Sequence, residues 1–221
     1  TISSLFSYFK DRENRQSLSR ALLAIAGKDS SLQEIAELCA ALNSFKEGRI
    51  DEPDYDRRLA AYSALSGDRE TSLTPKQWLP LLHNLIFHIR DDAEFGILSS
   101  NSADGLRRFI RDAAACTSEP SKEKFDVHLR GVIMPALYAG AREPSDTARR
   151  EYLRVMGHLL STMPEWEPIA DLSALLNDRN EESTELTFFF NILSPATARQ
   201  LEALHILEAA NSQKEMGSQN L

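Results

Sequence analysis

Two groups of arginines have the residue type and the spacing to bind phosphate groups or an acidic peptide. In the first group, Arg107 and Arg111 are four residues apart and Arg108 is beside them. Residues four apart lie on one face of a helix. Guanidinium groups form strong hydrogen bonds, often two at a time, with phosphates and carboxylates. The first group therefore predicts a small basic surface on one helix.

The second group repeats this pattern further along the chain. Arg150, Arg154 and His158 are spaced four residues apart, and Arg149 is adjacent. Both groups fall on the second helix of a predicted helical hairpin, so stacked hairpins could place them in one positive stripe. Phosphate contacts of this kind position a protein on nucleic acid. We predict that six arginines bind RNA or a protein partner: Arg107, Arg108, Arg111, Arg149, Arg150 and Arg154.

A simpler interpretation of the same arginines stays open at this point. Carboxylates lie within one helical turn of several of them, namely Asp104, Asp112 and Glu151. Ion pairs of this kind are common on protein surfaces and contribute little energy. The arginines could therefore be ordinary surface residues that are paired with these neighbours.

The sequence predicts no catalytic, cofactor-binding or metal-binding residue. No dinucleotide-binding glycine motif, phosphate-binding lysine loop or nucleophile elbow occurs. His83 and His88 are five residues apart, unlike the four-residue spacing of a zinc-binding helix. The two cysteines, Cys39 and Cys116, are too few for a disulfide framework or a four-cysteine zinc site.

Composition indicates a folded, acidic chain. It has 221 residues, of which 42% are hydrophobic and 26% charged, and its formal net charge is -8. An acidic chain does not bind polyanions over its whole surface, so any nucleic-acid contact would be a local patch. No run approaches the roughly 20 apolar residues of a membrane span. The chain begins at Thr1 rather than Met, and we expect it to be a piece of a longer protein.

Helical periodicity runs through the sequence. Residues 14–26 carry leucines at helical spacing before Gly27, and Thr74-Pro75 is a strong helix-start signal. Ser31 and Glu34 have the spacing of a capping box, which predicts a helix start there. Alternating strand patterns are nearly absent. The predicted fold class is all-α.

Two segments look like copies of one helical hairpin, residues 79–110 and 134–160. Each has an apolar helix with an internal proline, an acidic turn, a basic stretch and a second apolar helix. Such hairpins bury their apolar faces by stacking. We predict a HEAT-like α-solenoid of about four to five stacked hairpins. Its parts would be hairpins over 1–73, repeats over 74–116 and 117–163, a partial repeat with a Phe-rich element over 164–212, and a disordered tail over 213–221.

Several segments, taken in order, resemble one family. They are residues 82–91, 102–110, 133–140, 150–159, 164–167 and 171–176, followed by Phe188-Phe189-Phe190-Asn191-Ile192. Their order resembles the DRIM ("down-regulated in metastasis") family, giant HEAT-repeat components of the small-subunit processome. The likeness is clearest after Thr74. One stretch departs from the family: residues 194–201 keep only Arg199 where the family has a basic helix. An RNA contact at that helix is therefore not carried over to this chain.

The resemblance implies a non-catalytic scaffold in the nucleolus that supports ribosomal RNA processing and assembly of the small ribosomal subunit. Its implied partners are other processome proteins, precursor ribosomal RNA and a small nucleolar ribonucleoprotein. Two other functions stay open. One is a HEAT-type protein-binding adaptor unrelated to ribosomes, such as a transport or signalling scaffold. The other is a helical enzyme with an unrecognised pocket.

Overall fold

The computed structural model describes residues 2–49, 52–67, 72–91, 96–175 and 188–218. In these ranges the chain is helical, and the one β contact is an isolated bridge between Phe45 and Pro53. The predicted all-α class is confirmed. The chain divides into two compact units, Thr1–Ala136 and Leu137–Leu221.

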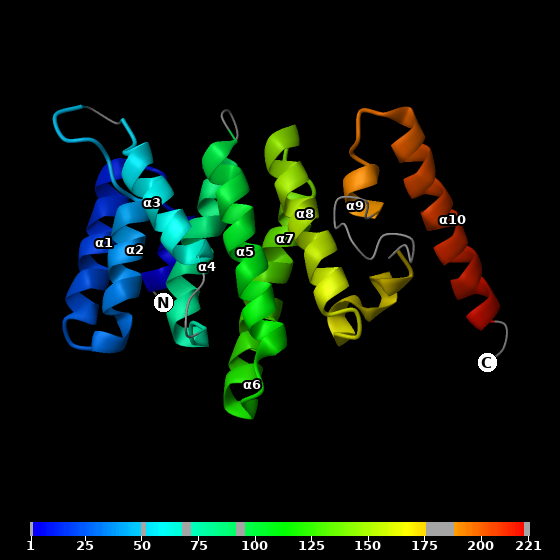
Figure 1. Cartoon of the computed structure of the whole chain (residues 1–221), viewed down its shortest axis with the longest axis horizontal. Helices are drawn as coiled ribbons and strands as arrows, with labels where there is room; N and C mark the ends of the chain where they lie inside the picture. The colour runs from blue at the N-terminus through cyan, green and yellow to red at the C-terminus, as the bar shows by residue number, and fades with distance from the viewer. Residues whose placement is uncertain (1, 50–51, 68–71, 92–95, 176–187, 219–221) are drawn as a thin grey trace. The chain divides into compact units, whose positions relative to one another are not determined.

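The first unit contains most of the helices (Figure 1). In chain order its elements are η1 Ile2–Ser7, α1 Arg12–Ala26, η2 Ser30–Leu32, α2 Gln33–Leu42, α3 Tyr55–Ser66, α4 Pro75–Asp91, α5 Ile97–Ala115, α6 Glu119–His128 and η3 Leu129–Ile133. Helix α7, Met134–Gly140, crosses from the first unit into the second.

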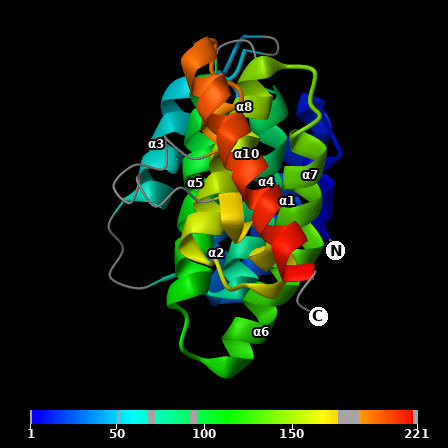
Figure 2. The ribbon, with the colours of Figure 1, turned by 90° about the vertical axis from the view of Figure 1, so that its right-hand side faces the viewer.

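Helix α4 is the centre of the first unit. It packs against α2, α5 and η1, while α3 packs against α2 and α5. In the view of Figure 2, α3 and α5 lie on one side and α4 and α1 on the other. The core is formed by large apolar side chains from these helices, and Tyr62, Trp78 and Phe109 are fully buried. Burial of such side chains is the main source of the unit's stability.

Helices α4 and α5 form an antiparallel hairpin, which confirms the first hairpin predicted from the sequence. The Ser99 hydroxyl donates to the main-chain oxygen of Ile89 at 3.1 Å near the turn. At the other end, the Trp78 ring packs edge-on against Phe109 with 5.5 Å between centroids. Midway, Gly105 lets the two helices approach, because a Cβ there would lie 2.9 Å from a Leu85 methyl.

The start of α4 confirms the helix predicted at Thr74-Pro75. The Gln77 Oε1 atom accepts hydrogen bonds from the Thr74 main-chain N–H and hydroxyl, both at 2.9 Å. The Gln77 N–H points back to the Thr74 hydroxyl oxygen at 3.4 Å. This reciprocal arrangement is a capping box that satisfies free amides at the helix start.

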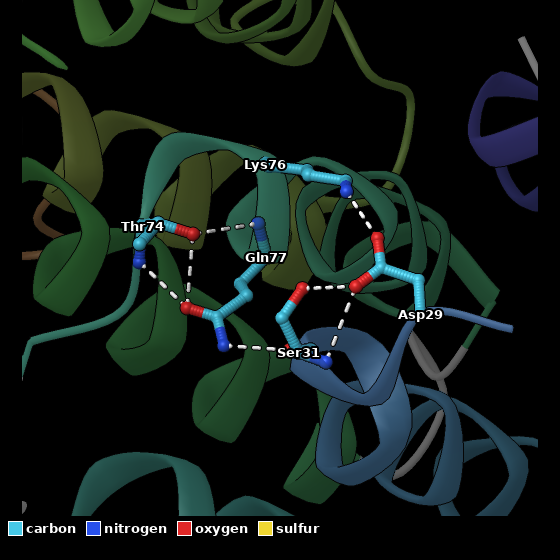
Figure 3. A network of polar contacts seen from close by, with 5 residues as sticks. All are labelled: Asp29, Ser31, Thr74, Lys76 and Gln77. Carbon is cyan, nitrogen blue, oxygen red and sulfur yellow. Dashed lines mark hydrogen bonds and ion pairs between the residues drawn. The ribbon is translucent and has the colours of Figure 1, made fainter. Parts of the chain in front are cut away.

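The capping box predicted at Ser31 is wrong. Asp29 is the capping residue: its Oδ1 accepts hydrogen bonds from the Ser31 N–H at 3.2 Å and from the Ser31 hydroxyl at 2.6 Å (Figure 3). A short 3₁₀ turn intervenes, so α2 begins after Leu32 with no side-chain cap. Sequence spacing alone does not separate these two helix starts, because both place a polar side chain before an apolar run.

Residues 119–140 form one continuous helical rod made of α6, η3 and α7. The sequence predicts a helix from Phe125 to Tyr138, which is confirmed and extended at both ends. Its middle is a π-helical turn in which the Met134 N–H donates to Leu129, five residues earlier. Pro135 follows directly and has no N–H to donate, so the α-helical hydrogen bond to the residue four positions earlier is absent there. The π-helical turn therefore lies next to a position where the hydrogen-bond pattern of the α-helix is interrupted.

The second unit is built on α8, Asp146–Thr162, which packs against η4, Glu167–Leu175, and α9, Phe188–Asn191. Helix α10, Thr197–Ser218, packs against α9 and η4 and extends past residue 213, where the sequence predicts a tail. The Ser145 hydroxyl caps α8 through the Ala148 N–H at 3.3 Å. The predicted loop over 177–185 lies outside the described residues. No described helix is long and apolar enough to span a membrane.

Candidate partner-binding surface

The three arginines of the first group lie on α5 and have different surroundings. Arg107 pairs with the Asp104 carboxylate one turn earlier. The Arg108 Nε donates to Asp112 Oδ1 at 3.0 Å, and that carboxylate also accepts the indole N–H of Trp78 at 3.1 Å. Arg111 is exposed and forms no hydrogen bond or ion pair within the described chain. Of this group, Arg111 is therefore the one with a guanidinium group ready for a partner.

The second group lies on α8 and shows the same division. Arg149 pairs with Asp146 and also donates to the main-chain oxygen of Glu143 at 2.7 Å. Arg154 forms an ion pair with Glu151 at 3.1 Å. Arg150 is exposed and has no polar partner in the part of the chain that the structure describes.

The structure therefore places four of the six predicted arginines in intrahelical ion pairs. Three of the carboxylates, Asp104, Asp112 and Glu151, are those that the simpler interpretation of the sequence names. A guanidinium already paired with a carboxylate gives up part of that interaction when it binds a phosphate. Arg111 and Arg150 carry no such cost. The two groups lie in different units, so the single positive stripe stays a prediction.

A polar groove that sequence reasoning missed lies at the N-terminal end of α1. It has a volume of about 820 Å³, and three basic and three acidic residues line it together with Gln16, Phe45 and Pro53: Lys10, Arg12, Arg58, Asp11, Glu13 and Asp91. The guanidinium carbons of Arg12 and Arg58 lie 5.1 and 4.9 Å from the centre of the Phe45 ring. Cation–π contacts of this kind fix the ring and both side chains. No sequence motif marks the groove, because its residues come from four separate segments.

A buried arginine near this groove is a structural residue that sequence patterns also missed. Arg15 is 2% exposed. Its guanidinium donates to the side-chain oxygens of Asn43 at 2.6 Å and Asn84 at 3.0 Å, and to the main-chain oxygen of Phe6 at 2.6 Å. It also stacks 3.5 Å from the centre of the Phe87 ring. Desolvation lowers the pKa of Arg15 to about 10. Arg15 thus links η1, α1, α2 and α4.

The histidines and the buried cysteine take part in packing. His88 is fully enclosed, and its Nδ1 shares a 2.7 Å hydrogen bond with the Tyr62 hydroxyl, which lies 2.5 Å from the Ser102 hydroxyl. Burial holds the pKa of His88 well below its usual value, and burial lowers that of His83 to about 4. Burial likewise raises the pKa of the Cys39 thiol to about 12, which keeps it unreactive. Within the described ranges, no three His, Cys, Asp or Glu residues lie close enough to hold a metal ion.

Comparison with known proteins identifies the family. The family model described as U3 small nucleolar RNA-associated protein 20, N-terminal, matches residues 1–145. The protein of that name from Schizosaccharomyces pombe is 28% identical over 204 residues, which cover 92% of this chain and 8% of the relative. The Saccharomyces cerevisiae protein of the same name is 28% identical over 192 residues, covering 87% of this chain and 8% of the relative. No solved structure matches the chain.

These matches extend the likeness that the sequence segments suggest. The segments point to residues after Thr74, whereas the family model begins at residue 1 and so includes the first three α-helices. The chain spans about 8% of the length of the curated relatives it matches. Because the family model covers well over half of the chain, and agrees with the resemblance to the DRIM family, the chain belongs to the family of the N-terminal region of U3 small nucleolar RNA-associated protein 20.

Proposed function

We propose that this chain is a section of a non-catalytic helical-repeat scaffold in the small-subunit processome. The observation that carries the proposal is the family match, together with alignment of nearly the whole chain to two yeast proteins named as U3 small nucleolar RNA-associated. In this role the chain supports ribosomal RNA processing and assembly of the small ribosomal subunit, and it acts in the nucleolus.

The scaffold has the architecture of a HEAT-like α-solenoid of about four to five hairpins. Support comes from the antiparallel α4–α5 hairpin and from the packing of α2 and α3 against it. In an array of this kind, helices bury their apolar faces on the neighbouring repeats. An array of this kind offers a long surface for several weak contacts.

A non-catalytic role is supported by where the chemically versatile side chains lie. His88 and Cys39 are fully enclosed in the first unit's core. His128 is partly enclosed, and its Nε2 lies 3.0 Å from the main-chain oxygen of Pro75. The enclosed His88 and Cys39 are shielded from a substrate, and His128 makes a structural contact.

The partners we propose are other processome proteins, precursor ribosomal RNA and the small nucleolar ribonucleoprotein that contains the U3 RNA. Within the predicted arginines, Arg111 and Arg150 carry most of the contact, because both are exposed and neither has a carboxylate partner in the described chain. The four paired arginines contribute less, because a phosphate must compete with a neighbouring carboxylate for each of them.

Crosslinking in cells tests the proposal. The protein that carries this chain is crosslinked, and the U3 RNA, precursor ribosomal RNA and proteins recovered with the segment are measured. Arg111→Glu combined with Arg150→Glu is expected to reduce RNA recovery, whereas Arg57→Glu, which reverses an exposed arginine of α3, is expected to leave it unchanged. Absence of the segment from pre-ribosomal particles on sedimentation would refute the processome role and favour an unrelated adaptor. Particle association that survives the double reversal would refute the arginine assignment alone.

A further inference from the structure

The Ser31-x-x-Glu34 motif has no capping role in the structure, which leaves its function unexplained. The Ser31 side chain is exposed and its hydroxyl points to Asp29 rather than to a free amide of α2. Figure 3 shows Ser31 between Gln77 and Asp29, in a polar cluster that joins the turn before α2 to the start of α4. A serine hydroxyl in this position is accessible to a modifying enzyme.

The residues around Ser31 form an acidic recognition pattern. Asp29 precedes the serine by two positions, and Glu34 and Glu37 follow it by three and six. All of these lie at the surface or only half-buried. Protein kinases select substrates partly by such charge patterns, and a basic substrate groove favours acidic residues after the acceptor serine. The neighbouring Ser30 is also exposed but has Gln33 at the third position after it, so it lacks this signal.

A cation is already in place to receive the phosphate. Lys76, from the first turn of α4, forms an ion pair with the Oδ2 atom of Asp29, while Oδ1 of the same carboxylate accepts the Ser31 hydroxyl. One carboxylate therefore separates the Ser31 oxygen from the Lys76 ammonium. The Lys76 side chain is 63% exposed, so it is free to turn toward a new partner.

We propose that Ser31 is phosphorylated by a protein kinase that prefers acidic residues near its target serine. The phosphate on Ser31 then forms an ion pair with Lys76, in place of the ion pair between Lys76 and Asp29. In the phosphorylation step the Ser31 oxygen forms a bond to the γ-phosphorus of ATP, the bond from that phosphorus to the β-phosphate oxygen breaks, and ADP leaves. The hydroxyl proton passes to the kinase's base. The phosphate brings a charge of about -1.5 to -2 and three acceptor oxygens, against the single charge of Asp29.

The consequence is a change of contacts at one junction between helices. Phosphorylation removes the hydrogen bond that the Ser31 hydroxyl donates to Asp29, and it places two negative groups side by side. Lys76 moves to the more highly charged group, and the Gln77 amide keeps its 2.9 Å hydrogen bond to the main-chain oxygen of Ser31. The link between the start of α2 and the start of α4 then depends on phosphate and Lys76. This inference does not rest on the proposed processome role.

Two measurements test the proposal with the 221-residue chain. In the first, the chain is incubated with ATP and a serine/threonine kinase that prefers acidic residues near its target serine, and modified residues are located by mass spectrometry. We expect phosphate on Ser31, its loss in Ser31→Ala, its retention in Ser30→Ala, and slower incorporation in Glu34→Gln. A folded chain that takes up no phosphate at Ser31, or equal incorporation in Glu34→Gln, would overturn the assignment.

In the second, phosphoserine is introduced at position 31 and the melting temperature is compared with that of the unmodified chain, each with and without Lys76→Met. In the unmodified chain the ion pair between Lys76 and Asp29 is exposed, so Lys76→Met is expected to lower the melting temperature little. In the phosphorylated chain, Lys76→Met is expected to lower the melting temperature by about twice as much or more, since the phosphate carries about twice the charge of the Asp29 carboxylate. Equal changes in the two forms would show that the phosphate does not bind Lys76 and would refute that part of the proposal.

Discussion

Replacing Gly140 by alanine is expected to destabilise the second unit strongly. An alanine Cβ at this position would lie 2.1 Å from Cγ and 2.2 Å from Cδ2 of the Tyr152 ring. Carbon atoms pack at about 3.5–4.0 Å, so the ring would have to retreat by about 1.5 Å. Tyr152 has no exposed surface, so the close-packed core has no space to receive it.

The magnitude follows from opposing effects. Forcing an extra methyl group into a packed core costs about 1–3 kcal/mol and occasionally more. Alanine recovers up to about 1 kcal/mol in a helix through lower backbone entropy in the unfolded chain. Gly140 is the last residue of α7, where that gain is smaller. We expect a net loss of about 2 kcal/mol in the free energy of unfolding.

Gly131 provides a matched control in the same helical rod. Nothing lies within 4 Å of a Cβ built there. Gly131→Ala is therefore expected to stabilise the chain by about 0.5–1 kcal/mol. The two variants differ by the same methyl group in the same rod, so their opposite signs would isolate the effect of packing.

Urea unfolding followed by circular dichroism measures both variants. A double-mutant cycle with Tyr152→Ala tests the cause, because the clash requires the ring. Tyr152→Ala alone is expected to cost about 3–5 kcal/mol through the cavity it leaves, a range taken from large aromatic deletions. Adding Gly140→Ala to it is then expected to cost little. The reasoning is refuted if Gly140→Ala destabilises the Tyr152→Ala chain as much as it destabilises the original one.

Other predictions concern titration, the buried arginine and surface charge. Burial depresses the folded-state pKa of His88 and His83, so the unfolded chain takes up protons first and stability is lost as pH falls below about 6.5. The loss is up to about 1.4 kcal/mol per pH unit for the enclosed His88. It is smaller for the partly exposed His83, whose contribution ends near its folded-state pKa of about 4. Urea midpoints between pH 7 and pH 5 check this, and His83→Gln should reduce the slope. Arg15→Lys is expected to cost about 2–4 kcal/mol, because an ammonium cannot reproduce the planar set of hydrogen bonds to Asn43, Asn84 and Phe6. Thermal unfolding measures that loss, and a melting temperature equal to that of the original chain would contradict the role given to Arg15. Asp112→Asn, which disrupts the ion pair with Arg108, is expected to destabilise the chain, because Asp112 is 7% exposed and accepts hydrogen bonds from both Arg108 and Trp78. As a control, Asp104→Asn removes the charge of a more exposed carboxylate and should change the free energy of unfolding by less than about 1 kcal/mol.

The sequence by itself determined the fold class and most helix positions. Apolar residues at helical spacing, Gly27 and the Thr74-Pro75 start signal are local features, and local geometry is what sets where a helix begins and ends. The segments after Thr74, taken in their order along the chain, were also sufficient to indicate the family. The capping role of Asp29, in place of Ser31, was missed because two polar side chains two residues apart compete for the same helix start.

Only the tertiary structure decided which polar residues are available to partners. The spacing of Arg107, Arg108 and Arg111 is equally compatible with a binding surface and with ion pairs, and the choice depends on which carboxylates each guanidinium meets. The burial of Arg15 is likewise invisible in the sequence, because its partners Asn43 and Asn84 come from segments 28 and 69 residues away. A periodic pattern reports which face of a helix is apolar, whereas long-range packing decides which charged side chain is enclosed and which remains in water.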